Sequence, residues 1–106
     1  MIPKISIYYF PYTFKSNSKG EAPIYCKITV NGESKRFSTG ISISPKQWDT
    51  PKQKVKGKNL ITEDINNTLQ AITEQIQVIE KKLLEQQPEG FTLDDLYFCY
   101  KQGIPN

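Results

Sequence analysis

The sequence predicts an α+β fold in which a three-stranded antiparallel sheet packs on a long helix, with a short C-terminal helix. Runs rich in β-branched and aromatic residues at 5–10, 24–30 and 34–41 predict three strands. Over residues 62–87, apolar residues recur at helical spacing. A length of 106 residues corresponds to one small domain, in which we expect residues 1–59 to form the sheet and a basic loop and residues 60–102 both helices.

The first strand is limited by Pro11, and the next two form a hairpin around Asn31-Gly32. Both turn residues tolerate the positive φ angles that a type I′ turn requires. A two-residue turn sets the register, so that the numbers of facing residues add to 63. Lys27 therefore faces Arg36, and Cys26 faces Phe37.

This register divides the hairpin into two unlike faces. One face is apolar except for Lys35 near the tip and is the expected core face: Ile24, Cys26, Ile28, Val30, Phe37, Ile41 and Ile43. The other face has no aliphatic residue and combines one aromatic ring, two cations and three hydroxyl groups: Tyr25, Lys27, Thr29, Ser34, Arg36 and Ser38.

The segment after the hairpin begins with a helix-start pattern, in which Ser44 is the expected N-cap and Pro45 the first helical residue. We expect Trp48 to pack between sheet and helix, with a partner for its N–H group. Residues 49–59 contain helix breakers and four lysines and predict a basic loop: Lys52, Lys54, Lys56 and Lys58.

The long helix carries one apolar stripe: Ile65, Leu69, Ile72, Ile76, Ile79 and Leu83. A helix of about 26 residues is roughly 39 Å long, whereas a seven-residue strand reaches about 23 Å. Part of the stripe must therefore pack on the last segment, on a neighbouring domain or on a second copy. The last segment fits this role, because Thr92 to Asp95 form a capping pattern that opens a short helix.

Composition argues against catalysis by this chain alone. It has no histidine and only two cysteines, Cys26 and Cys99, which are far apart and have apolar neighbours, so we expect reduced thiols and no metal site. Asp94 and Asp95 are adjacent on a helix and are explained by the helix dipole. We expect no cofactor and no small-molecule substrate. With no apolar run long enough to span a bilayer, we expect no membrane contact and a cytoplasmic location.

The charge distribution points to a polyanionic partner for the first half. Residues 1–58 carry a net charge of +8 and residues 59–106 a net charge of -5. Facing cations such as Lys27 and Arg36 repel each other unless phosphates neutralise them, and both can reach guanine edges in the major groove. We therefore expect this hairpin face to read double-stranded DNA, with Lys35 in support and backbone contacts from the lysine segment: Lys46, Lys52, Lys54, Lys56 and Lys58.

A set of short motifs follows one another along the chain: residues 20–32, 37–41, 45–49, 55–57, Ile65-Asn66 with Leu69, and 91–96. In this order they resemble the N-terminal arm DNA-binding domain of tyrosine-type site-specific recombinases, the integrases of Bacteroidetes-like mobile elements. The resemblance covers roughly residues 3–100. It implies a three-stranded sheet inserted into the major groove of arm-type sites, in support of DNA integration and recombination. The catalytic domain of such integrases is not in this chain, so residues 103–106 are expected to form a linker toward it.

Two other interpretations remain open. The stripe from Ile65 to Leu83 could serve a protein-interaction or dimerisation module, including contacts with other recombinase subunits. Alternatively, Tyr8, Phe10 and Tyr12, together with Tyr25, could stack on single-stranded nucleic acid. For Tyr8, Phe10 and Tyr12 we favour core or edge packing.

Overall fold

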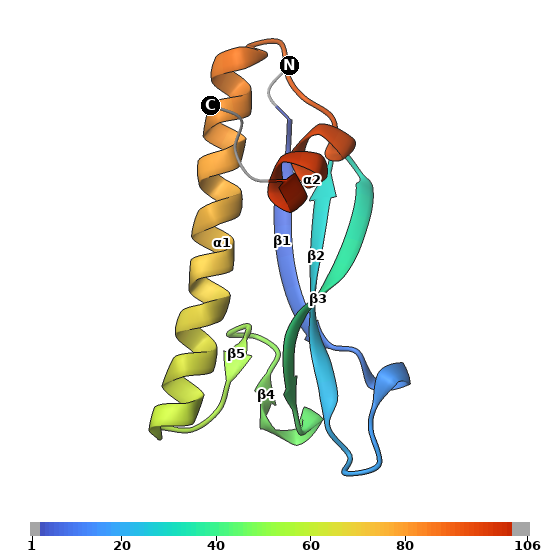
Figure 1. The fold of residues 1–106 in the computed structure, drawn as a ribbon, viewed down its shortest axis with the longest axis vertical. Coiled ribbons are helices and arrows are strands. Elements are labelled where there is room, and N and C mark those ends of the chain that lie inside the picture. Colours follow the sequence, from blue (N-terminus) through green and yellow to red (C-terminus); the bar gives the residue numbers. More distant parts are fainter. Residues whose placement is uncertain (1–2, 103–106) are drawn as a thin grey trace.

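Figure 1 presents the computed structural model of the chain, which describes residues 3–102. A three-stranded antiparallel sheet lies against one long helix, and a short helix follows, which confirms the predicted α+β fold. The strands and helices, including two 3-10 turns (η), are β1 (Ile5–Pro11), η1 (Thr13–Lys15), β2 (Ala22–Val30), β3 (Glu33–Ile43), η2 (Pro45–Gln47), β4 (Trp48–Asp49), β5 (Lys54–Val55), α1 (Leu60–Gln86) and α2 (Leu93–Gln102).

The hairpin between β2 and β3 has the predicted turn and register. Asn31 and Gly32 have φ angles of 52° and 88°, as a type I′ turn requires. From Val30 opposite Glu33 to Tyr25 opposite Ser38, the paired residue numbers add to 63. β1 adds to the other edge of β2, which therefore becomes the central strand of the order β1-β2-β3.

The predicted register does not extend to the far end of the hairpin. There the pairing shifts, and Ala22 lies opposite Ile43. Gly40 has a φ of 82°, a left-handed conformation that accommodates a bulge in β3. The Thr39 hydroxyl donates a hydrogen bond to the Ile24 carbonyl oxygen at 2.8 Å beside this irregularity. The uniform register was therefore wrong beyond Tyr25, because a glycine changed the strand geometry.

The core lies between the sheet and α1, as the alternation in β2 predicted. Ile24, Cys26 and Ile28 of β2 are completely buried, and so is Ile76 of α1. Phe37 and Ile43 of β3 are buried in the same cluster, and Ile41 packs against it.

The α1 stripe is covered within the chain. α1 begins after Asn59, whose side-chain oxygen accepts a hydrogen bond from the Thr62 N–H group at 2.8 Å. Beyond the end of α1 the chain turns back. Phe91 and Leu96 are buried there in the same core cluster as the stripe residues of α1. The sequence left three candidates that could cover the stripe: the last segment, a neighbouring domain or a second copy. In the structure, the last segment packs over it. Leu69, Ile76, Ile79 and Leu83 are buried within the chain, which argues against the protein-interaction or dimerisation module expected to use the Ile65–Leu83 stripe.

The segment between sheet and helix differs from its prediction. Residues 45–47 form only a 3-10 turn, and Ser44 makes no side-chain cap hydrogen bond. Trp48 is buried as expected, but among the described residues its indole N–H has no partner. The predicted basic loop contains a short ribbon in which Trp48 pairs with Val55. The Asn66 amide of α1 holds this ribbon: it accepts from the Val55 N–H at 2.8 Å and donates to the Val55 carbonyl at 3.1 Å.

No helix within residues 3–102 combines the length and the apolar character needed to cross a membrane. The linker predicted at residues 103–106 lies outside the described residues.

Candidate nucleic-acid interface

The sheet surface that points away from α1, the outer face, consists of three rows of residues that face one another across the strands. The pairing of β1 with β2 and of β2 with β3 brings together residues with alternating numbers. From the hairpin tip inward, the rows are Ser6, Thr29 and Ser34, then Tyr8, Lys27 and Arg36, then Phe10, Tyr25 and Ser38. All six outer-face residues expected from the hairpin are therefore on one surface.

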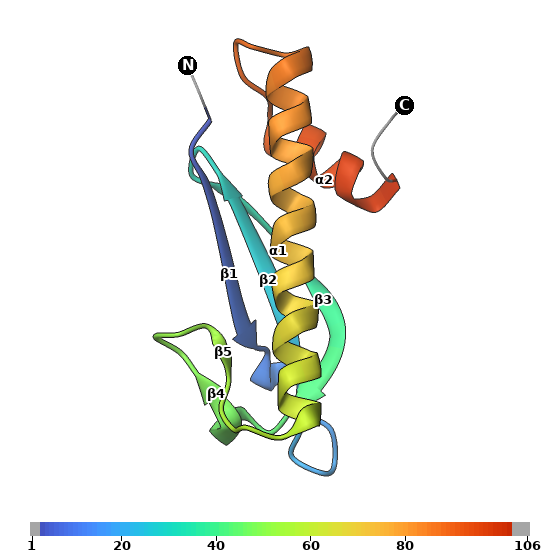
Figure 2. The ribbon, with the colours of Figure 1, turned by 90° about the vertical axis from the view of Figure 1, so that its left-hand side faces the viewer.

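No α-helix of the described residues covers the outer face, because α1 lies against the opposite side of the sheet (Figures 1 and 2). In Figure 1, α1 and η1 lie on opposite sides of the sheet. Figure 2, viewed from the side of α1, shows α1 in front of the strands, α2 beside β3, and β4 and β5 beside β1. η1 is the element that borders the outer face.

The middle row concentrates positive charge. Lys27 and Arg36 are directly opposite each other, and neither has an acidic partner among the described residues. The guanidinium carbon of Arg36 is 4.8 Å from the ring centroid of Tyr12, an interaction that the negative ring face favours. In the row nearer the tip, the hydroxyl groups of Thr29 and Ser34 are 2.8 Å apart and hydrogen bonded. This arrangement presents cations and hydroxyl groups to an anionic partner.

Aromatic rings form the other end of the outer face. Phe10 lies 6.1 Å from Tyr8 and 6.2 Å from Tyr25 between ring centroids, and Tyr12 stacks on Tyr25 at 4.8 Å. Phe14 of η1 extends the series and is 92% exposed. Of the expected core or edge packing, Tyr8, Phe10 and Tyr12 show the second: they pack on one another and on Tyr25 at the β1 side of the sheet and are not part of the buried core. Their alternate positions, read against the pairing of β1 with β2, are the sequence signal that would have placed them beside Lys27.

The outer face is also slightly hollow. A depression of about 380 Å³ is lined by aromatic rings from β1 and polar or charged residues from β2 and β3: Tyr8, Phe10, Lys27, Ser34, Lys35 and Arg36. One further cation was missed by the sequence interpretation. The Lys15 ammonium lies 5.5 Å from the Tyr25 ring centroid, and its hydrogen bond with Tyr25 raises the pKa of the Lys15 ammonium. Lys15 therefore remains charged at neutral pH.

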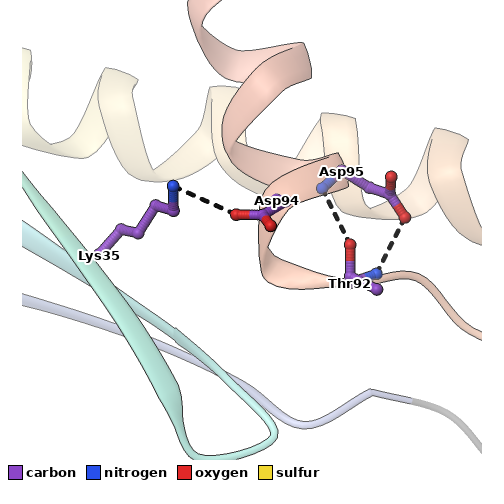
Figure 3. A network of polar contacts seen from close by, with 4 residues as sticks. All are labelled: Lys35, Thr92, Asp94 and Asp95. Atoms are coloured by element: carbon purple, nitrogen blue, oxygen red, sulfur yellow. Dashed lines mark hydrogen bonds and ion pairs between the residues drawn. The ribbon is translucent and has the colours of Figure 1, made fainter.

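The ammonium of Lys35 lies on the opposite side of the sheet, although Lys35 belongs to the predicted site. It is 3.1 Å from a carboxylate oxygen of Asp94 in α2 (Figure 3). It also lies 5.0 Å from the ring centroid of Tyr97 in the same helix. Figure 3 also shows the cap of α2, where Thr92 and Asp95 exchange two hydrogen bonds between side chain and backbone, as their spacing predicted. Lys35 thus borders the outer depression, but its ammonium group points away from Lys27 and Arg36 toward α2.

The lysine segment lies around the β1 edge rather than on the outer face. Lys52 and Lys54 line a second depression, of about 450 Å³, together with Tyr9 and residues of α1. The Gln53 side chain in the same turn accepts a hydrogen bond from the Tyr9 backbone N–H at the free edge of β1. Lys46, Lys56 and Lys58 are exposed. Lys52 and Lys54 therefore lie beside β1 rather than in the three rows of the outer face.

The buried titratable groups belong to the core. Burial raises the pKa of the Cys26 thiol to about 12, and burial likewise raises the pKa of the Tyr9 phenol. The Tyr9 hydroxyl lies 2.9 Å from the Thr73 hydroxyl and donates to the Leu69 carbonyl oxygen at 3.1 Å. Both groups therefore stay protonated at neutral pH. Within residues 3–102, no three His, Cys, Asp or Glu side chains gather as metal ligands.

A basic outer face on a sheet supported by one helix is a surface suited to binding a polyanion such as DNA. Residues 11–97 match the Arm DNA-binding domain family, and the chain belongs to this family, which is typical of tyrosine recombinases and integrases. Comparison with curated proteins and with solved structures gave no match. The chain is therefore a DNA-binding module of the kind used in recombination.

Proposed function

We propose that the outer face enters the major groove of double-stranded DNA and that Lys27 and Arg36 contact base edges there. The main support is the middle row of the outer face. There Lys27 and Arg36 face each other at the centre of the sheet, and neither has an acidic partner among the described residues. The major groove is about 12 Å wide and admits a β-ribbon. Arginine can bind the O6 and N7 atoms of guanine through two donors, which suits Arg36 to base readout.

Side chains around the middle row support this contact. Thr29, Ser34 and Ser38 offer hydroxyl groups to phosphates or base edges, and Tyr25 offers a ring edge beside Lys27. The exposed lysines of the segment 46–58 would reach the phosphates that border the groove: Lys46, Lys52, Lys54, Lys56 and Lys58. The biological sites would be arm-type sites that flank a recombination core, and the module would support integration and recombination by a tyrosine recombinase of a mobile element.

The first test compares two charge removals in the full 106-residue chain. We expect Arg36→Ala to weaken duplex binding by about 1–3 kcal/mol and to relax sequence preference, because it removes a base-edge contact. Lys81→Ala is the matched control, since it removes the same charge from the exposed side of α1. Affinity is measured by fluorescence anisotropy on a selected duplex and on random duplex at moderate salt. Equal affinities of Arg36→Ala and Lys81→Ala would contradict the proposed groove contact.

The second test separates backbone contacts from base contacts. We expect Lys54→Ala to weaken binding to all duplexes alike and to reduce the slope of log affinity against log salt by about one unit. Salt titrations of the wild type and of Lys54→Ala measure this slope on the same two duplexes. A sequence-dependent loss in Lys54→Ala would place this lysine among the base-reading residues instead.

A further inference from the structure

The depression on the outer face combines an apolar wall of aromatic rings with cationic side chains. The ring of Tyr8 is 42% exposed, and the rings of Tyr8 and Phe10 lie 6.1 Å apart with an angle of 30° between their planes. They form one apolar wall of the depression. Lys27, directly opposite Tyr8, supplies an ammonium group beside that wall.

These rings do not serve the core. Tyr8 and Phe10 alternate with Ile7 and Tyr9, which face α1 and pack in or against the core cluster. A ligand that carries an apolar group beside a hydrogen-bond acceptor would use both the exposed rings and the neighbouring cation.

In the major groove, thymine presents that pair of groups. Its edge carries the O4 acceptor next to the C5-methyl group, whereas guanine offers two acceptors and no methyl. We propose that the depression receives a thymine edge, with Lys27 donating to O4 and the rings of Tyr8 and Phe10 contacting the methyl group. Arg36, held over Tyr12, remains available for a neighbouring guanine. This inference rests on the proposed groove contact and adds a base preference to it.

The experiment removes the methyl group from the DNA rather than from the protein. A preferred duplex is first selected from a randomised library with the full chain, and each of its thymines is then replaced by deoxyuridine, which retains O4. We expect the replacement of one thymine to weaken binding of the wild type about fourfold. This loss corresponds to the burial of one methyl group, which uracil lacks. This measurement depends on no variant and therefore on no variant's folding.

The same replacement is repeated in variants to locate the contact. In Tyr8→Ala and in Phe10→Ala we expect the difference between thymine and uracil to be reduced or lost. In Tyr8→Phe it should persist, because the ring remains. Phe14→Ala is the matched control: Phe14 is 92% exposed and does not line the depression, so its removal should leave the difference unchanged.

The outcomes separate the two proposals. Selective duplex binding with no effect of uracil at any position would overturn the thymine contact and leave the groove contact standing. An effect of uracil that persists at full size in both Tyr8→Ala and Phe10→Ala would also overturn it. If no duplex binds more tightly than single-stranded DNA at any salt concentration, the proposed groove contact is wrong, and the thymine contact is wrong with it.

Discussion

Lys35 and Arg36 are consecutive residues of β3, and their side chains serve opposite faces of the sheet. Arg36 lies over the Tyr12 ring on the outer face, whereas Lys35 pairs with Asp94 of α2. Alternation along a strand produces this separation, because successive side chains point to opposite faces. Two neighbouring cations of equal charge therefore have different roles, and net charge alone does not identify a contact residue.

At the same scale, we expect stability to fall as the pH rises above about 9. Burial raises the pKa of the Cys26 thiol from 9.0 to about 12, so between these values the unfolded chain releases a proton that the folded chain retains. This contribution is fully present below pH 9 and decreases by up to about 1.4 kcal/mol per pH unit above it. Burial of the Tyr9 phenol acts in the same direction above pH 10.

Urea unfolding at pH 8, 9 and 10 measures this slope. Cys26→Ala is the informative variant, because it removes the thiol without adding a buried polar group. Its stability should change less between pH 9 and 10 than that of the wild type. Equal slopes for both proteins would assign the pH dependence to other groups.

At the scale of elements, the β4 and β5 ribbon depends on one side chain of α1. The Asn66 amide both accepts from and donates to the backbone of Val55. We expect Asn66→Asp to destabilise the fold by about 1–3 kcal/mol, because a carboxylate cannot donate to the Val55 carbonyl and places a negative charge against it.

The matched control is Asn67→Asp, which introduces the same charge at the next, exposed position of α1. Urea unfolding compares the two variants, and amide hydrogen exchange of Val55 reports the ribbon directly. Similar stabilities of the two variants, with unchanged protection of Val55, would show that the Asn66 amide does not hold the ribbon.

At the scale of the whole molecule, α2 completes the core by packing against α1 and β3. Leu96 is completely buried, whereas Phe98 of the same helix is 63% exposed. We expect Leu96→Ala to cost about 2–5 kcal/mol of unfolding free energy, because it leaves a cavity in a packed core. Phe98→Ala should change stability little. Urea unfolding measures both, and equal small effects would mean that α2 is not an integral part of the fold.

Local signals in the sequence were sufficient to predict four features: the hairpin turn, the two faces of β2 and β3, the apolar stripe of α1 and the cap of α2. Each of these depends on residues close in the chain, such as Asn31-Gly32 or Thr92 with Asp95, and on a simple period of side-chain direction. The six outer-face residues of the hairpin could be grouped for the same reason.

Only the tertiary structure showed which segment covers the α1 stripe, where the lysine segment lies and which side chains β1 adds to the outer face. These features depend on contacts between residues distant in the chain, such as Tyr8 with Lys27, Asn66 with Val55 and Lys35 with Asp94. Hydrophobic periodicity indicates that a face is buried but not which segment buries it, because burial of apolar surface is not directional. The sequence by itself therefore determined a basic sheet face, and the folded chain determined that aromatic rings of β1 complete it.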